Sequence, residues 1–346
     1  AQLNALFPSK EVEVINTAMT SVNSHVVYQV AETIPANSAD VAVILMGNNE
    51  VVGPYGPGTF NQNFLSSLGA IRTLQWAKRL RIWQWLDQAF QGVQPSDAKT
   101  DLEWQGMQMF VENGVAESDP RMIDLYAHFE ANLRDIIDIL SDKGMHVVLS
   151  TVPVNLRHSA PFLSMTDNTL SPEFSQRVSD LKARAAAQSR NLQWRAASTL
   201  WQQAIEIDPG HADSHFQLAT SLEWQGDHLG AKRHFERALD LDALRFRADT
   251  KINDRIRAVG KNYPSASLSF VDSAAAFNRA STPFSPGWES LVEHVHYTFA
   301  GNDVLARIFS RAIATHVTVE RPQGVLNSEE VAERVGYPNH ATTENM

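Results

Sequence analysis

Short apolar runs recur along the chain and predict the strands of a parallel sheet. Residues 41–46, VAVILM, contain no polar side chain and end at a Gly-Asn turn. Residues 146–154, HVVLSTVPV, and residues 267–271, SLSFV, have the same largely apolar character. Runs of this length are typical of strands that are buried on both faces. Residues 11–15, EVEVI, alternate charged and apolar side chains and predict a fourth strand.

Segments with the period of an amphipathic helix separate these strands. We expect helices over residues 3–7, 25–34, 121–140 and 301–316, with Gly144 as the stop signal of the third. A helix between two strands of one sheet is the connection that parallel strands require. The pattern therefore predicts an α/β fold built on a parallel sheet.

Residues 173–260 are almost entirely helix-forming, and part of this segment repeats. Small and aromatic residues recur 34 positions apart, because Ala197, Trp201, Ala204 and Pro209 are followed by Ala231, Phe235, Ala238 and Ala243. This period is typical of tetratricopeptide repeats, in which two antiparallel helices pack closely. The earlier repeat is degenerate, with Arg184 at an apolar position. Two repeats are fewer than a free-standing solenoid needs, so we expect the module to pack on the α/β part. The expected divisions are residues 1–172, 173–260 and 261–346.

Composition limits the classes of partner. The 346 residues carry a formal net charge of −10, and the pI is near 5.6. Nucleic-acid-binding faces are usually basic, so this charge argues against a nucleic-acid partner. The chain has no cysteine, which excludes disulfides, thiolate zinc sites and cysteine nucleophiles but does not decide the compartment. No stretch approaches the roughly 18 unbroken apolar residues of a membrane span.

Two segments have alternative interpretations. The glycine- and proline-rich residues 53–58 resemble a phosphate-binding loop, but the prolines remove N–H donors and favour an ordinary loop. Residues 70–90 predict a long helix that interleaves Trp76 and two further tryptophans with basic residues. Such a helix either lies on a membrane surface or packs its aromatic side chains on its own domain, and we favour the second. Residues 104–111 are largely apolar and suggest part of a lid.

Two short segments carry side chains suited to catalysis. Gly47 allows a sharp turn after the first apolar run, Asn49 places an amide donor at the mouth of the sheet, and Glu50 is suited to hold the turn. A turn in which these residues serve only backbone geometry is an equal alternative. Glu293 and His296 are spaced so that a carboxylate can orient an imidazole, as a catalytic base requires. Surface histidines are the simpler interpretation, and metal chelation by the His-x-His pair lacks a third ligand cluster.

Three blocks together resemble the SGNH (GDSL-type) hydrolase family. They are residues 16–19, NTAM, residues 47–50, GNNE, and the Glu293-x-x-His296 pair. The chain is similar in particular to bacterial SGNH-type proteins that carry a tetratricopeptide insert. Further matching phrases extend the resemblance over nearly the whole chain: GNNEVVGPYG (47–56), WQGM (104–107), STVPVNLRHSAPF (150–162) and DLDALRFRAD (240–249).

The resemblance implies a three-layer, flavodoxin-like α/β domain and a hydrolase that acts on ester bonds through a serine acyl-enzyme. Asn49 would donate its side-chain amide to the oxyanion hole. Ala18 falls where the family usually has a glycine whose backbone amide joins that hole, although alanine resists a positive φ. His296 would be the general base, and Glu293 stands where the family more often has aspartate. The resemblance implies no metal and no cofactor.

The nucleophile is the largest departure from the family pattern. The family's serine follows the first strand, ahead of the NTAM block, and no residue before Glu11 fits that position. We therefore expect the chain to begin downstream of its nucleophile, to be inactive and poorly stable by itself, and to have unpaired strand edges. The partner of an active enzyme would be a small or polymer-linked ester. The alternative from another class is a non-catalytic scaffold that binds proteins through the repeats.

Overall fold

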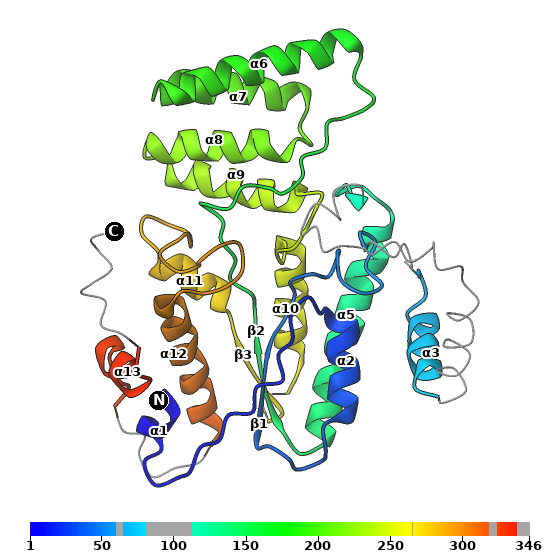
Figure 1. Ribbon diagram of the computed structural model, residues 1–346, viewed down its shortest axis with the longest axis vertical. Coiled ribbons are helices and arrows are strands. Elements are labelled where there is room, and N and C mark those ends of the chain that lie inside the picture. The colour runs from blue at the N-terminus through cyan, green and yellow to red at the C-terminus, as the bar shows by residue number, and fades with distance from the viewer. Residues whose placement is uncertain (60–64, 81–112, 265, 318–323, 338–346) are drawn as a thin grey trace, which may run out of the picture.

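A three-stranded parallel sheet lies at the centre of the molecule (Figure 1). The computed structural model describes residues 1–59, 65–80, 113–264, 266–317 and 324–337. The strands run in the order β1 (Val41–Leu45), β2 (His146–Ser150) and β3 (Leu268–Val271). Both strand pairs are parallel. A strand therefore forms in each of the three apolar runs, although the second strand ends at Ser150 rather than at Val154. The predicted α/β class with a parallel sheet is confirmed.

The predicted strand over residues 11–15 is wrong. In the described structure this segment makes no sheet hydrogen bonds, and Val14 and Ile15 are 77% and 64% exposed. Alternation of charged and apolar residues favours an extended backbone, but a strand also needs a hydrogen-bonded neighbour and an apolar surface to cover. The described sheet accordingly has three strands rather than four.

Helices flank the sheet on both sides. Those on one side are α2 (Ser24–Thr33), α5 (Arg121–Asp142) and α10 (Thr250–Asn262), and those on the other are α11 (Ser273–Ala280) and α12 (Phe299–His316) (Figure 1). Two short helices lie close to α12, namely α1 (Gln2–Leu6) and α13 (Ser328–Arg334). The bounds of the four predicted helices of the α/β part are correct to within two residues.

The main core forms where α5 meets the sheet. Four side chains of α5 are fully buried, namely Phe129, Leu133, Ile136 and Ile137. Their spacing of three and four residues places them on one helix face, and each contributes about 1.5–3 kcal/mol through burial. Gly144 adopts a left-handed φ of +87° just after the helix, so the predicted stop is confirmed.

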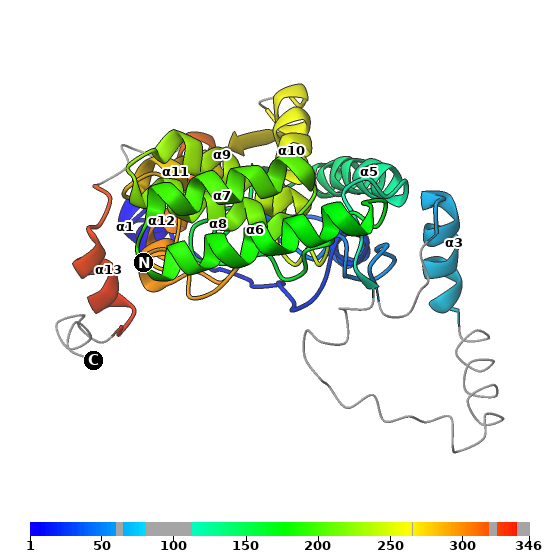
Figure 2. The ribbon, with the colours of Figure 1, turned by 90° about the horizontal axis from the view of Figure 1, so that it is seen from above.

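Four antiparallel helices stack above the sheet (Figures 1 and 2). They are α6 (Pro172–Arg190), α7 (Trp194–Ile207), α8 (Ala212–Trp224) and α9 (His228–Leu241). We call these four helices the helical stack. The bounds of α7 and α9 differ by 34 residues at both ends, from 194 to 228 and from 207 to 241. The repeating small residues are buried between helices, so the sequence period matches the period of the structure.

The chain enters the stack at its far side. After β2 it runs through residues 163–171 to α6, the helix furthest from the sheet, and then returns stepwise through α7, α8 and α9 (Figure 1). The two ends of the stack meet, because the Ala243 N–H donates to the Leu163 carbonyl at 2.9 Å. α10 lies within the helix-forming segment 173–260, but its Ile252 and Ile256 pack in the main core against the sheet.

The helix α3 (Leu68–Lys78) lies at the periphery, beyond α2 and α5 (Figures 1 and 2). It begins two residues before the helix predicted over residues 70–90 and ends at Lys78, so the predicted continuation through residues 79 and 80 is wrong. The remainder of that segment from residue 81, and the suggested lid at 104–111, lie outside the described residues. None of the helices within the described ranges is long and apolar enough to cross a bilayer.

Candidate functional site

The candidate site lies at the carboxyl ends of the parallel strands. β1 leads into residues 47–50, and β2 leads into residues 151–156. Because the strands are parallel, these segments emerge at the same edge, where open α/β folds place their ligands.

Asn49 occupies a tight turn that the rest of the fold holds in place. Its φ is +62°, a left-handed conformation that asparagine tolerates better than most residues. Its N–H donates to the Phe246 carbonyl at 3.2 Å, and its own carbonyl accepts from the Gly53 N–H at 2.7 Å. The side-chain amide of Asn49 makes no hydrogen bond to any residue that the structure describes. It is therefore available as a donor to a ligand.

Gly47 begins this turn under tight steric limits. Its φ is +150°, and a Cβ there would lie 2.8 Å from Cγ2 of Ile252 on α10. The turn thus packs directly against α10, and a side chain at this position would force them apart.

Glu50 links the turn to the start of α2 through hydrogen bonds. Its carboxylate accepts from the Ser24 N–H at 2.7 Å and from the Ser24 hydroxyl at 2.8 Å. Asn132 of α5 donates to the same hydroxyl at 3.1 Å. Burial raises the pKa of Glu50 to about 7, although both bonds from Ser24 oppose that shift. Glu50 therefore supports the turn from inside the protein rather than facing a ligand.

Glu293 and His296 form the hydrogen-bonded pair that their spacing predicts. The Nδ1 of His296 lies 2.7 Å from Oε1 of Glu293, and the same oxygen accepts the His296 N–H at 2.6 Å. A carboxylate can only accept, so Nδ1 carries the proton and Nε2 is the basic nitrogen. The His296 side chain is 76% exposed, so Nε2 is open to solvent. This is the arrangement of a base and its orienting group.

The pKa of Glu293 lies below its ordinary value. Partial burial is the largest influence and raises it, but it is outweighed by hydrogen bonds from the His296 and Val295 amides and by the two neighbouring histidines. The carboxylate is therefore ionised and suited to hold the imidazole in one orientation.

His294 faces inward, unlike His296. Its ring packs edge-on against Phe162 and Phe246, with ring centroids 5.0 and 6.0 Å away. Its Nδ1 contacts Oε2 of Glu293, and burial lowers its pKa. Both histidines thus turn Nδ1 toward the same carboxylate, and no group of three metal-ligating residues occurs within the described parts of the chain.

The segment after β2 holds the histidine loop at the sheet edge. Asn155 donates from its side chain to the Glu293 carbonyl at 3.0 Å, and its N–H donates to the His294 carbonyl at 3.0 Å. The hydroxyl of Tyr297 donates to the Pro153 carbonyl at 2.9 Å. The loop is therefore fixed at both ends of the Glu293–His296 pair.

Residues 242–249, which we call the strap, connect the two halves of the site. Phe246 of the strap accepts the Asn49 N–H through its carbonyl and packs its ring near His294. Arg247 is buried and donates to the Asn155 and Ser159 carbonyls at 2.8 and 2.7 Å. Sequence reasoning used this stretch only as part of a resemblance and missed its role. The available signal was the pair of arginines alternating with apolar residues between Asp242 and Asp249.

Ala18 is not joined to these residues. It lies in an exposed loop, and its N–H donates to Oδ1 of Asn16 at 2.9 Å. Within the described structure none of its contacts reaches Asn49 or the histidine loop.

The glycine- and proline-rich loop at residues 53–58 uses its own donors. The N–H of Gly56 donates to the Gly53 carbonyl at 2.9 Å, and that of Gly58 donates to the Val51 carbonyl at 2.9 Å. Amides engaged in this way do not form a phosphate cradle, which agrees with the ordinary loop favoured by the sequence.

Comparison with known proteins adds no relative: no family model, no curated protein and no solved structure matches the chain.

Proposed function

We propose that this protein cleaves or transfers acyl groups at ester bonds through a serine acyl-enzyme, as an SGNH-type hydrolase with tetratricopeptide repeats inserted in a flavodoxin-like domain. One observation carries the proposal. The Nδ1 of His296 is held by Glu293 at 2.7 Å, its Nε2 faces solvent, and the loop is fixed at the carboxyl edge of a parallel sheet.

Each group has a defined part in the proposed reaction. His296 Nε2 accepts the proton of a serine hydroxyl as the serine oxygen bonds to the ester carbon, and Glu293 stabilises the imidazolium that results. The free amide of Asn49 stabilises the negative charge on the carbonyl oxygen. His296 then protonates the departing alkoxide, and water or an acceptor alcohol releases the acyl group. None of the chain's own serines is assigned the role of nucleophile.

The test is hydrolysis of p-nitrophenyl acetate by the protein as its gene encodes it. Because His296 is the proposed base, His296→Ala is expected to lower kcat/KM by about 10⁴-fold, and Glu293→Gln by at least about 10²-fold. His316→Ala is the matched control, since His316 is exposed and stacks on His146 at the start of β2, at the opposite edge of the sheet. Activity that survives His296→Ala would remove His296 from the reaction.

A second candidate is a non-catalytic scaffold in which the helical stack binds proteins. The engaged N–H of Ala18 favours it, because that amide is the second donor expected of an oxyanion hole. Two results together would favour the scaffold. They are absence of esterase activity in the protein and no change in its stability after His296→Ala.

A further inference from the structure

α3 has two faces of opposite character. Ile71 and Gln75 lie one turn apart and are buried, and the Gln75 side chain donates to the His25 carbonyl at 3.2 Å. On another face Trp76 is 60% exposed, and Leu80, which follows the helix end, is 42% exposed. The inner contacts already fix the helix on α2 and α5. The exposed indole is therefore not needed to dock the helix on its own domain.

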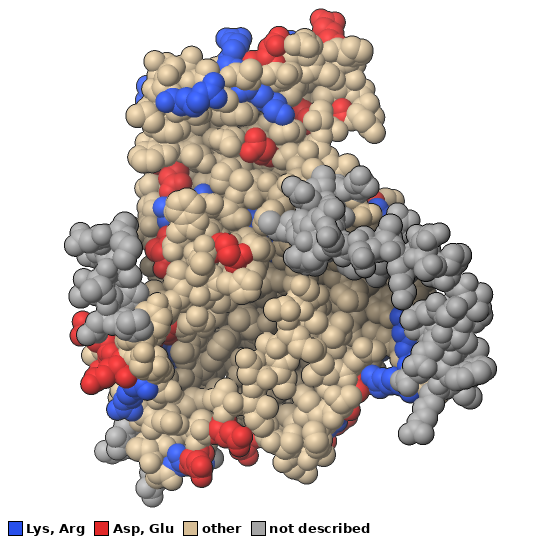
Figure 3. Space-filling model, in the orientation of Figure 1, with Lys and Arg blue, Asp and Glu red and all other residues tan. Residues whose placement is uncertain are grey.

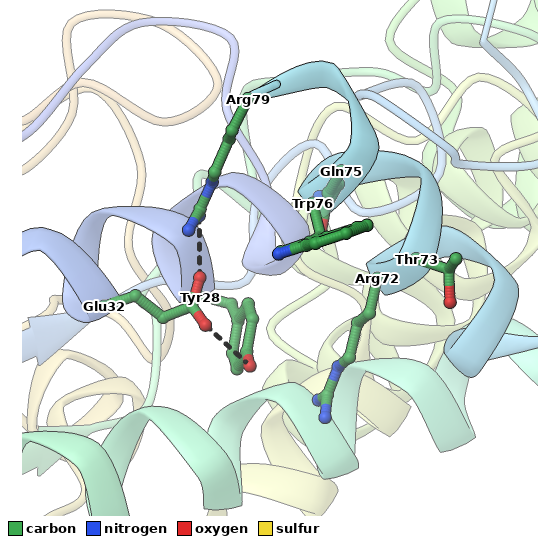
Figure 4. Close-up of a pocket in the computed structure, with 7 residues that line it drawn as sticks. All are labelled: Tyr28, Glu32, Arg72, Thr73, Gln75, Trp76 and Arg79. Carbon is green, nitrogen blue, oxygen red and sulfur yellow. Dashed lines mark hydrogen bonds and ion pairs between the residues drawn. The ribbon is translucent and has the colours of Figure 1, made fainter. Parts of the chain in front are cut away.

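Basic side chains surround the exposed indole. Arg79 and Arg72 extend from α3 on either side of Trp76, toward Tyr28 and Glu32 of α2 (Figure 4). Glu32 pairs with Arg79 at 2.7 Å, and Asp135 of α5 pairs with Arg72. These pairs hold the guanidinium groups beside the indole while leaving them 43% and 30% exposed.

Two cavities flank these cations. One of about 320 Å³ is lined by Arg72, Trp76 and Arg79, and a second of about 420 Å³ is lined by Lys78, Arg79 and Tyr55. The ammonium of Lys78 lies 5.9 Å from the centre of the Tyr55 ring and pairs with no carboxylate among the described residues. Arginine and lysine beside an open cavity suit a phosphate group.

The charge of this region is opposite to that of the molecule. The three cations Arg72, Lys78 and Arg79 exceed by one the two carboxylates that pair with them, Glu32 and Asp135, which leaves a net charge of +1. The chain carries a formal charge of −10. The face shown in Figure 3 carries side chains of both signs. A local positive charge next to exposed Trp and Leu side chains is complementary to an anionic lipid surface.

We propose that α3 and its two flanking cavities dock the protein on anionic phospholipid membranes. Trp76 and Leu80 enter the headgroup region, while Lys78 and Arg79 contact lipid phosphates. The helix lies on the membrane surface and does not cross it. This proposal is independent of the esterase proposal, because it involves none of the residues of the candidate site.

Sedimentation with vesicles tests the proposal. We expect the protein to bind vesicles of phosphatidylcholine mixed with the anionic lipid phosphatidylglycerol, to bind pure phosphatidylcholine far less, and to dissociate as salt is added. Trp76→Ala is expected to weaken binding roughly tenfold through lost apolar contact. Lys78→Gln is expected to weaken it about fivefold, the effect of one charge.

Trp224→Ala is the matched control, since Trp224 is 67% exposed on the helical stack and should leave binding unchanged. The proposal is overturned by absence of binding to anionic vesicles, by equal binding to neutral ones, or by equal effects of Trp76→Ala and Trp224→Ala. It is also overturned if Trp76→Ala changes only the oligomeric state in size-exclusion chromatography, which would make α3 a contact between copies.

Discussion

Single residues at the strand ends show which parts of a site local sequence can predict. The contact between Glu293 and His296 depends on a spacing of three residues, so it was predictable without knowing the rest of the fold. The partners of Arg247 were not predictable, because its carbonyl acceptors are 92 and 88 residues away in sequence. Local sequence does not show which distant backbone groups satisfy a buried side chain.

Glu50 makes stability depend on pH in a defined direction. Its pKa is raised from 4.5 in the unfolded chain to about 7 in the fold, so between these values the unfolded state releases a proton that the folded state retains. The free energy of unfolding therefore falls as pH rises from about 4.5 to about 7, by roughly 3 kcal/mol from this residue.

Glu50→Gln is expected to remove this fall in the free energy of unfolding between low and high pH. Urea denaturation of the unchanged protein and of the variant, at about pH 5 and about pH 8, measures it. The buried His25, whose pKa is lowered to about 4 by burial, His128 and Arg72, acts in the opposite direction. It is present in both proteins, so the difference between them isolates Glu50. An equal change of stability with pH in the two proteins would contradict the shifted pKa.

At the scale of elements, the pattern of apolar residues predicted the type of secondary structure better than it predicted which strands pair. The three apolar runs became strands because helices cover them on both sides. Residues 11–15 have a comparable tendency to extend but find no strand to pair with in the described structure. Local pattern sets the preference of the backbone, and the fold decides whether a partner is present.

The strap contains a buried ion pair whose loss should be costly. Asp242 is buried and accepts from the Phe162 and Leu163 amides at 3.0 and 3.1 Å, and it pairs with Arg247 at 3.3 Å. The Leu244 amide also donates to Asp242, at 3.1 Å. Asp242→Ala removes the acceptor of these three amides and the carboxylate that pairs with the buried Arg247, so we expect a loss of about 3–5 kcal/mol in the free energy of unfolding.

Chemical denaturation measures this loss, and Asp254→Ala is the control. Asp254 also pairs with an arginine, Arg257 at 2.9 Å, but its side chain is 69% exposed. Its removal is expected to change stability by no more than about 1 kcal/mol. Similar losses for the two variants would contradict the importance of the buried strap.

For the molecule as a whole, the sequence period indicated stacked helices but not which helices pack on the sheet. The period of 34 residues anticipated the bounds of α7 and α9. It could not separate α10 from the stack, because an amphipathic helix has the same pattern whether it packs on helices or on a sheet. The main core crosses this division, since Phe235 and Leu239 of α9 belong to the same cluster as the strand residues.

A shared core predicts that the stack and the α/β part unfold together. Phe235 is 1% exposed, so Phe235→Ala is expected to cost about 3–5 kcal/mol and to lower a single thermal transition. Calorimetry and circular dichroism check this, with Phe174→Ala on the exposed face of α6 as the control. Two separate transitions, only one of them shifted, would show that the stack is an independent unit.

The path of the chain into the stack has a consequence for how such a protein evolves. The chain runs through residues 163–171, which we call the ascending segment, to the outermost helix α6 and then returns through α7, α8 and α9. The length of the ascending segment therefore limits the height of the stack. Packed helices are about 10 Å apart, and a duplicated helical hairpin would raise the top by about 20 Å. An extended chain covers about 3.4 Å per residue, so the ascending segment would have to lengthen by about six residues in step. Gain or loss of a helical hairpin in the stack therefore requires two coordinated changes in the gene rather than one.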